Sequence, residues 1–577
     1  MNKFTFAAAL AASLFLVGCK VVVKVPDGGS VTSASGDFDC ASGEECSIDV
    51  TNFDFEETFT AVPEEGFEFI GWSTTGFCAT STAPCRLTTV GLDGVNDDLT
   101  ELVTQFLESD SEEFFVEPLF SPFEATGITA LLETNADIAL AAYSDSIDTA
   151  MALQDAINAF AADPSQETLD AAKLAWLVAR EPYGQTEVYR FRLSPIDSTN
   201  YADEDGPEGD INAWPLAEAL IDYVIAADPD FGFDQVGATE NSVGVNDGGE
   251  VDGTIETLNI IADTSITIDT DLISNTATAE DERDVIAGYH AIEFMLWGQD
   301  LNDMAMVTNG DDRDEAVKTQ GASNLAAGGQ RPLSDFTEDA LGERRILYMQ
   351  VVVEKLIADL ESVRDGWLDG VEGTYRDQFT SFADTQEAIQ RVTEILTGMG
   401  TLSEGELAGE RMQIAYSSNS QEDEHSCFAD NTHRDVVLNA LGIANSFYGD
   451  YAGYDSDLDG VADETTRAVN GYGFDDYAAD VNLESLDAVI AELDARLQVT
   501  EDNYNELDAA ARNGSPFDVL IMDDNRNSDN PIFKTIISLN QQSSSIAELA
   551  ELLAIEVQVV DDDASGCDTT NPDTDCG

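Results

Sequence analysis

A histidine and a glutamate lie one helical turn apart in an apolar stretch of this very acidic chain. The stretch GYHAIEFMLWGQD, residues 288–300, contains His290 and Glu293 among apolar side chains. On a helix, residues i and i+3 share a face with Cβ atoms about 5–6 Å apart, which suits two ligands of one metal ion. The same spacing suits a buried histidine that is hydrogen-bonded to its own glutamate. Both interpretations are open at this stage, and Gly288 would let another backbone approach closely.

The other two histidines of the chain lie in a second polar stretch. Residues 421–435, QEDEHSCFADNTHRD, contain His425 and His433 among several carboxylates. All three histidines of a 577-residue chain therefore fall in two short, polar segments. Imidazoles and carboxylates are suitable ligands for iron and zinc. We expect the first pair to meet a group from this second stretch, His425 or Glu424, as a further metal ligand.

A third polar stretch, GGQRPLSDF at residues 328–336, combines a Gly-rich turn with charged side chains. Its candidate site residues, to which we add His433, are Arg331, Ser334 and Asp335. An unpaired carboxylate is costly in an apolar surrounding, so Glu293 is expected to meet a cation. A metal ion would supply that charge, and so would either of two arginines, Arg331 and Arg192.

The segment DSDLDGVADETT, residues 455–466, has part of the spacing of a calcium loop. The acidic positions are Asp455, Asp457, Asp459 and Asp463, with Gly460 at the turn. The twelfth position is Thr466 instead of the usual glutamate, so the segment is not a full EF-hand loop. A short Asp-rich calcium loop and a plain acidic turn are both open interpretations.

The elements that must position the polar stretches are helical from about residue 125 onward. Apolar residues recur there with the spacing of amphipathic helices. Examples are Leu169, Ala172, Trp176 and Ala179; Met349, Val352, Leu356, Leu360 and Val363; and Leu486, Ile490, Leu493 and Leu497. The pattern predicts a mainly α fold of helical bundles over residues 125–555. Gly/Asp-rich insertions interrupt it at roughly 236–256 and 450–480, and residues 556–577 are predicted to be an acidic flexible tail with a small cysteine loop.

Residues 19–122 are predicted to form a small β-rich domain. The runs VVVKV, FTAVPEEGFEFIGWS and FFVEPLF are short and of β type, and Gly-, Ser- and Asp-rich turns separate them. The phrase GFEFIGWS and the cysteine loops resemble the divergent internalin B-repeat of bacterial surface proteins. That resemblance implies a stalk or spacer.

The first residues, MNKFTFAAALAASLFLVGCK, resemble a bacterial lipoprotein signal. Lys3 is its positive end, and the apolar run that follows is too short to span a bilayer. We therefore expect residues 1–18 to be a signal peptide and Cys19 to carry a lipid that anchors the protein to a membrane. Lys20, in place of aspartate, favours the outer membrane. An ordinary cleaved signal is the alternative.

The remaining cysteines fit an exported protein, in which disulfides form readily. The sequence leaves the connectivity open, but three local pairs need no long-range assumption, and Cys427 is then left over. The expected pairs are Cys40 with Cys46, Cys78 with Cys85, and Cys567 with Cys576.

The charge of the chain excludes one class of partner. The chain has 114 acidic and 25 basic residues, which give a formal net charge of −89. Nucleic acid binding needs a basic face, so no nucleic acid partner is expected. The acidic residues are spread along the whole chain, which favours a solvated surface over a dedicated cation-attracting field.

Taken together, the polar blocks resemble the imelysin family, and in particular its branch named iron-regulated protein A. The G-x-H-x-x-E motif of that family corresponds here to Gly288, His290 and Glu293. Four further blocks, REPYGQTE, INAWPL, GQRPLSDF and EHSCFADNTH, lie in family order within about residues 125–555. The resemblance implies an all-helical fold of two bundle-like halves, with a site between them and G-x-H-x-x-E as a metal motif. It also implies a surface or periplasmic role linked to iron, and some members are described as metallopeptidases.

Three functions are consistent with these features. The first is a cell-surface lipoprotein that binds a divalent or ferric metal ion (iron or zinc), or an iron-bearing ligand, for iron uptake with a surface or uptake protein as partner. The second is a metallopeptidase in which Glu293 or a neighbouring carboxylate activates a metal-bound water. A catalytic zinc usually has three protein ligands, and the motif shows two. The third is an adhesin, which leaves the clustered histidines unexplained.

Overall fold

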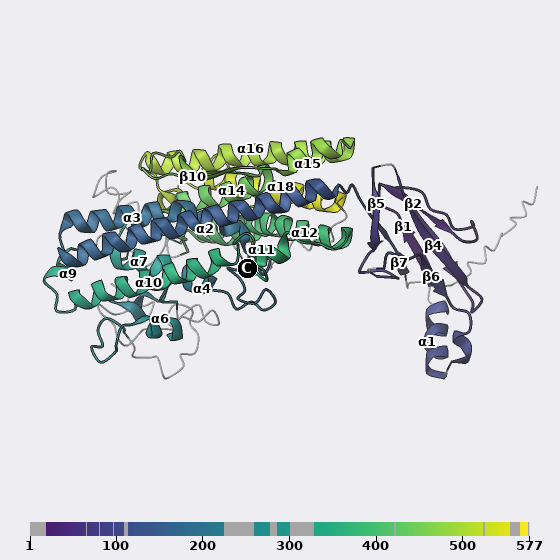
Figure 1. The fold of residues 1–577 in the computed structure, drawn as a ribbon, viewed down its shortest axis with the longest axis horizontal. Coiled ribbons are helices and arrows are strands. Elements are labelled where there is room, and N and C mark those ends of the chain that lie inside the picture. The colour runs from purple at the N-terminus through teal and green to yellow at the C-terminus, as the bar shows by residue number, and fades with distance from the viewer. Residues whose placement is uncertain are drawn as a thin grey trace, which may run out of the picture. The chain divides into compact units, whose positions relative to one another are not determined.

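The computed structural model describes residues 19–576 except residues 65, 80, 96, 109–112, 224–258, 277–284, 300–327, 330, 421–422, 523–524, 554–565 and 575. The predicted leader at 1–18, the predicted insertion at 236–256 and residues 556–565 of the predicted tail lie outside the described residues. The chain divides between Glu124 and Ala125 into two compact units (Figure 1).

The N-terminal unit is built from short strands. Its elements are β1 (Cys19–Lys24), β2 (Gly29–Ser33), β3 (Glu45–Val50), β4 (Glu56–Pro63), β5 (Glu68–Trp72), β6 (Cys85–Thr88), η1 (Leu92–Gly94), α1 (Asp97–Glu108), β7 (Glu113–Val116) and β8 (Pro118–Ser121). The sheet orders are β3-β1-β7, β2-β4-β6 and β5-β8. All strand pairs are antiparallel except β1 with β7, which is parallel. The predicted β-rich character of this region is confirmed, whereas the internalin-type repeat stays a prediction.

Apolar side chains from these small sheets meet in one core. Val23, Val31, Phe59 and Val116 are each fully buried, and Trp72 is 1% exposed. Burial of aliphatic and aromatic side chains is the main favourable term in folding. A unit of this size buries a smaller fraction of its surface than a large domain, so covalent cross-links add useful stability.

Three disulfides are present: Cys40–Cys46 and Cys78–Cys85 in the N-terminal unit, and Cys567–Cys576 near the C-terminus. Cys427 is buried and is not part of a disulfide.

We expect mass spectrometry of non-reduced peptides from the exported protein to find these three local cross-links and an unmodified Cys427. The two cysteines of each pair are close in the chain, so oxidation needs no rearrangement. Burial shields the Cys427 thiol from oxidants. A cross-link between Cys427 and any cysteine of the N-terminal unit would contradict this pairing.

The second unit is helical. Its long elements are α2 (Ala125–Ala162), α3 (Gln166–Gly184), α7 (Gly288–Trp297), α10 (Gly342–Asp365), α12 (Thr385–Thr401), η7 (Leu402–Gln413), α14 (Thr432–Tyr448), α15 (Phe474–Val481), α16 (Glu484–Arg512) and α18 (Pro531–Leu552). Its short elements are η2 (Glu187–Tyr189), α4 (Glu208–Ile211), α5 (Glu218–Ile221), α6 (Thr270–Thr276), α9 (Ser334–Thr337), α11 (Tyr375–Phe379), α13 (Ile414–Ser418), β9 (Asp450–Tyr454), β10 (Asp463–Asn470) and α17 (Phe517–Leu520). The predicted mainly α fold with a small β-rich region in front is confirmed.

The helices pack in two groups that follow the chain. In the first group α2 packs against α3 and α10, and α7 packs against α3 and α10. In the second group α14 packs against η7 and α16, and α12 packs against η7. Contacts between α3 and α14 join the groups, and Figure 1 shows α2, α3 and α10 running alongside one another. The two bundle-like halves expected from the resemblance are confirmed.

Local sequence fixes where these helices begin. The hydroxyl of Ser165 accepts a hydrogen bond from the Thr168 amide, and the Thr168 hydroxyl accepts one from the Ser165 amide, which completes a capping box at α3. The apolar face that follows, with Leu169, Ala172 and Trp176, is buried. An amphipathic stripe of this kind is stabilised mainly by the neighbours it packs against.

Helix α7 is buried along its whole length, which is unusual for an element that carries a histidine and a glutamate. Gly288 opens the helix with φ +79°, and a Cβ at this position would lie 2.3 Å from the Ile211 carbonyl oxygen. A larger residue would be both strained and blocked. Gly288 thus allows α4 to approach α7 closely.

Described residues after Gly566, where the composition predicts a flexible tail, contact the helical unit. Thr569 is 5% exposed, and the Gln413 side chain donates to the Asp568 and Thr574 carbonyl oxygens at 3.2 Å. Composition predicted flexibility because acidic and small residues bury little apolar surface. The Cys567–Cys576 disulfide closes the loop, which lowers the entropy lost on docking.

No described helix combines the length and the apolar character that a membrane crossing requires.

Candidate metal site

His290 and Glu293 contact each other inside the helical unit. His290 Nδ1 lies 2.9 Å from Glu293 Oε2, and both side chains are fully buried. The other carboxylate oxygen accepts a hydrogen bond from the Ala429 amide at 2.9 Å. His290 Nε2 is buried and has no hydrogen-bond partner among the described residues. The pair therefore points one ring nitrogen at its own glutamate and leaves the second nitrogen available.

His425 reaches the same place from the other half of the unit. Its ring contacts the His290 ring edge to face, with centroids 4.8 Å apart and an interplanar angle of 85°. His425 Nδ1 lies 2.9 Å from Asp435 Oδ2. Its Nε2 lies 3.5 Å from the Asn212 side-chain nitrogen, a long contact. Two imidazoles thus meet, each held at Nδ1 by a carboxylate.

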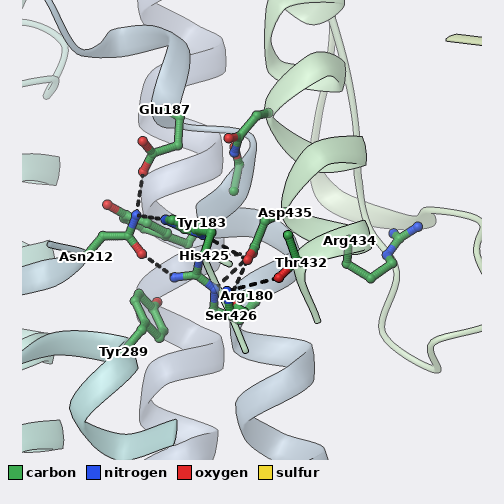
Figure 2. A network of polar contacts seen from close by, with 12 residues as sticks. Arg180, Tyr183, Glu187, Asn212, Tyr289, His425, Ser426, Thr432, Arg434 and Asp435 are labelled. Atoms are coloured by element: carbon green, nitrogen blue, oxygen red, sulfur yellow. Dashed lines mark hydrogen bonds and ion pairs between the residues drawn. The ribbon is translucent and has the colours of Figure 1, made fainter. Parts of the chain in front are cut away.

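Asp435 ties this arrangement to helix α3. Arg180 donates to Asp435 Oδ1 from Nη2 at 2.9 Å and from Nε at 3.3 Å, while the Ser426 hydroxyl donates to Oδ2 at 2.5 Å (Figure 2). Burial alone would raise the pKa of Asp435, but Arg180 and the hydrogen bond from His425 hold it well below its usual range. Asp435 is therefore ionised, and it fixes the proton of His425 on Nδ1.

A reciprocal ion pair lies one residue later on α3 and one residue earlier on α14. Arg434 donates to both oxygens of Glu181, at 2.9 and 2.7 Å. Arg180 and Glu181 on α3 thus pair with Asp435 and Arg434 on α14, with all four groups buried. These bidentate contacts fix the register of the two helices and hence the separation of the two histidines.

A cavity of about 250 Å³ opens beside His425. Its lining includes Arg190, Asn212, Trp214, Glu406, Arg411 and His425. Asn212 connects this wall to the site, because it accepts from Arg180 at 2.5 Å and donates to Glu187 at 3.3 Å (Figure 2). The cavity therefore leads to a histidine whose Nε2 is free of strong hydrogen bonds.

The arginines of the wall are already paired. Glu187 accepts from Arg411 at 2.8 Å and from Arg190 at 3.3 Å. Burial raises the pKa of Glu187, but the two arginines outweigh it and lower that pKa to about 2. The guanidinium charges are thus neutralised by neighbouring carboxylates and do not make the wall an anion site.

Burial decides the protonation of the two histidines and of Glu293. It lowers the pKa of His290 well below its ordinary value, an effect that the neighbouring His425 and Arg180 increase. It also lowers the pKa of His425. Burial raises the pKa of Glu293 well above its usual range, and the charge of Asp435 adds to this. Neutral imidazoles are the form that binds metal, and Glu293 is a carboxylate that a nearby cation would favour.

Neither arginine expected from the sequence contacts Glu293. Arg331 Nη1 pairs with Asp222 at 2.6 Å, and its guanidinium also lies over the Tyr223 ring. Arg192 donates to the Asn135 side chain at 3.2 and 3.3 Å and lies among aromatic rings. Among the described residues, no ion pair joins Glu293 to an arginine.

The other expected residues lie elsewhere. Asp335 accepts a hydrogen bond from Tyr223 at 2.5 Å, and Ser334 begins α9 beside it. His433 Nε2 lies 3.7 Å from Asp508, and burial lowers the pKa of His433 to about 4. Glu424 is buried and accepts from the Thr432 hydroxyl at 3.5 Å. The structure thus brings together His290, Glu293 and His425.

Several residues of the site were not singled out from the sequence. They are Arg180, Glu187, Asn212, Trp214, Arg411 and Asp435. Five of them lie in stretches that the sequence already marks as polar within apolar surroundings, REPYGQTE, INAWPL and the 421–435 block. Arg411 had no such signal, because its segment has an ordinary helical composition.

The acidic loop between β9 and β10 forms a separate cluster. Within the described part of the chain, ligand atoms of three acidic residues come within 4.8 Å of one another at Asp455, Asp457 and Asp463. Asp455 accepts from the Asp459 and Gly460 amides, which shapes the turn. An oxygen-rich loop suits calcium, but an acidic turn would look the same, so the calcium interpretation stays a prediction.

Comparison with known proteins bears on the whole helical unit. Residues 139–546 match the family model Peptidase_M75, described as Imelysin. The chain belongs to the imelysin family. A comparison with curated proteins finds no match.

Two solved structures are similar to this imelysin-family chain. One is described as an iron-regulated protein A precursor from Parabacteroides distasonis, with 15% identity and a TM-score of 0.47, over 75% of this chain and 96% of that one. The other is an imelysin-like protein from Psychrobacter arcticum, with 12% identity and a TM-score of 0.41, over 75% of this chain and 95% of that one.

Proposed function

We propose that this imelysin-family protein is a lipid-anchored envelope protein that binds a metal ion, iron or an iron-bearing ligand, through His290 and His425, and that it serves iron uptake. The observation that carries the proposal is the buried, unpartnered Nε2 of His290 beside a second imidazole. Buried polar atoms are nearly always hydrogen-bonded, so an orphaned ring nitrogen calls for an explanation.

The surroundings of the two rings support a metal. Metal-binding histidines commonly donate their other ring nitrogen to a carboxylate, which fixes the tautomer. Glu293 and Asp435 occupy that position, each 2.9 Å from an Nδ1. Glu293 thus orients His290 in preference to binding the metal itself. A metal ion at Nε2 would also supply the cation that Arg331 and Arg192 do not.

The cavity supports a ligand that brings further donors. Two imidazoles leave coordination positions open, and the cavity beside His425 offers room for waters or a small chelate. Its lining contains the acidic residues Glu208, Glu406, Glu410 and Asp423 against the two arginines Arg190 and Arg411. That balance favours a cation. When bound, the metal would act as a Lewis acid toward the oxygen donors of its ligand.

The peptidase alternative has weaker support. A catalytic zinc usually has three protein ligands, whereas the described residues bring two imidazoles together, with Glu293 turned to His290. A protease assay with and without a chelator addresses this alternative directly.

The proposal is tested by calorimetric titration of the purified protein with Fe²⁺, Zn²⁺ and ferric citrate. We expect saturable binding of at least one of these probes with one site per chain. Absence of binding for all three would remove the proposed function. If one of the probes binds, cross-linking in iron-starved cells tests for a surface or uptake protein as partner.

The membrane anchor has its own expected result. Replacement of Cys19 by serine should abolish lipid labelling and release the protein from the membrane fraction, because a lipid chain is the anchor and no described helix crosses a bilayer. Fractionation after metabolic labelling with a fatty acid measures both effects. Cys427→Ser is the matched control and should keep label and location. A Cys19→Ser protein that stays in the membrane fraction would exclude the anchor.

A further inference from the structure

Residues 402–413 form a π-helix of 12 residues inside an otherwise continuous helix. The helix runs from α12 through η7 into α13, from Thr385 to Ser418. π-Helices are rare, mostly limited to single-turn bulges, and often found at functional sites. A segment this long needs surrounding contacts that compensate for its poorer backbone geometry.

The π-helix places two cavity-lining residues on one face. Arg411 donates to Glu406 Oε1 from Nη2 at 2.6 Å and from Nε at 3.1 Å. These residues are five positions apart. In an α-helix with 3.6 residues per turn they would point about 140° apart. The ion pair therefore depends on the wider π-helical turn.

This pair holds the wall of the proposed metal site. Arg411 also donates to Glu187 at 2.8 Å, and Glu406 accepts from Arg190 at 3.2 Å. Glu187 in turn accepts from Asn212, which lies beside His425. A return of residues 402–413 to α-helical geometry would separate Glu406 from Arg411 and break this chain of contacts.

The C-terminal loop contacts the π-helix at three places. Gln413 donates to the carbonyl oxygens of Asp568 and Thr574, both at 3.2 Å. The Thr569 hydroxyl donates to Glu404 at 3.3 Å. The sulfur of Cys567 lies 3.8 Å from the Gly409 carbonyl oxygen. The loop thus spans the segment from its first turn to its last residue, and the Cys567–Cys576 disulfide closes it.

We propose that the disulfide-closed loop 566–576 holds residues 402–413 in the π-helical form and so keeps Glu406 and Arg411 in place as positioning residues of the metal site. The dependence of binding on the loop rests on the proposed function; the dependence of the π-helix on the loop does not. Helix α18 supports the first turn of the segment together with the loop, because Asn540 donates to Glu404 and Gln542 donates to Ser403. The loop supplies the contacts at Gly409 and Gln413 that α18 lacks.

The test replaces both loop cysteines, Cys567→Ser with Cys576→Ser, in the full chain. Replacement of Cys78 and Cys85 by serine is the matched control, because it removes a disulfide of the other compact unit. Hydrogen exchange of the amides in 402–413 and calorimetric affinity for Fe²⁺ or Zn²⁺ are measured on all three proteins. We expect faster exchange and about tenfold weaker binding in the loop variant alone, as for the loss of an outer-shell partner of a metal site.

The outcomes separate the two proposals. Unchanged exchange in 402–413, or equal changes in the control, would overturn the role of the loop. A wild-type protein that binds no metal would overturn the proposed function, while the exchange result would still decide whether the loop holds the π-helix. If the double variant does not fold, Gln413→Ala keeps the disulfide, removes the three hydrogen bonds from this side chain to the loop, and is expected to show the same two changes.

Discussion

Replacement of His290 by alanine is expected to abolish metal binding while helical content stays at the wild-type level. His290 offers the buried Nε2 that has no partner in the described structure, so its loss removes a ligand outright. The milder change Glu293→Gln keeps the shape but removes the carboxylate at Nδ1, and should weaken binding by about 10–100-fold. Calorimetry and far-ultraviolet circular dichroism measure affinity and helix content.

The matched control for this experiment is His433→Ala. That histidine also lies near a carboxylate, Asp508 at 3.7 Å, with its side chain 14% exposed, and none of its described contacts is to His290 or His425. The His433→Ala variant should bind metal with the same affinity as the wild type. Equal affinity of His290→Ala and wild type would make the His290–Glu293 pair structural and would leave the proposed function without its main residues.

The same binding should depend on pH in a particular direction. Metal competes with protons for the neutral imidazoles, and burial lowers the pKa of His290 and His425 below the ordinary value of 6.5. Affinity is therefore expected to fall as the solution becomes more acidic than that ordinary value, because the imidazoles then take up protons. An affinity that does not change in acid would contradict imidazole ligands.

Replacement of Asp435 by alanine is expected to destabilise the helical unit by about 3–5 kcal/mol, because it leaves the Arg180 charge buried without its paired carboxylate. Arg180 and Asp435 have side chains 1% and 2% exposed, and their closest atoms are 2.9 Å apart. The midpoint and slope of urea unfolding, followed by circular dichroism, measure the change.

The stability of wild type relative to this variant should also fall in acid. The folded-state pKa of Asp435 lies below its ordinary value of 3.8, so the contribution is complete above that pH and lost as the pH falls through the lowered pKa.

An exposed pair provides the control for this stability measurement. Arg496 and Glu492 are 2.7 Å apart with side chains 37% and 48% exposed. Glu492→Ala should change stability by only about 0.3–0.5 kcal/mol, as is usual for i,i+4 pairs on a helix surface. Similar effects of the two substitutions would mean that the pair between α3 and α14 does not hold the two halves together.

Much of the architecture could be predicted because its signals are local. Helical periodicity in Leu169, Ala172 and Trp176 follows from burying one face of a helix, and that face is buried in the structure. The G-x-H-x-x-E stretch is a short motif. Its helix and the contact between His290 and Glu293 could therefore be predicted from neighbouring residues alone. The family followed from the order of such blocks and is confirmed by the match over 139–546.

The partners of charged groups could not be predicted in the same way. Arg331 and Arg192 looked equivalent as cations for Glu293, yet one pairs with Asp222 and the other with Asn135. A charge in the interior takes whichever partner the packing of distant segments brings within hydrogen-bond distance. Composition carries no information about that distance.

The sequence by itself therefore determined the helical class, the β-rich region in front and the stretches in which the site lies. Only the tertiary structure decided that His425 is the residue beside His290, that Arg180 and Asp435 join across 255 positions of the chain, and that the C-terminal loop docks on the π-helix. The physical reason is that periodicity is encoded in neighbouring residues, whereas burial and ion pairing depend on surfaces that meet only when the two halves pack.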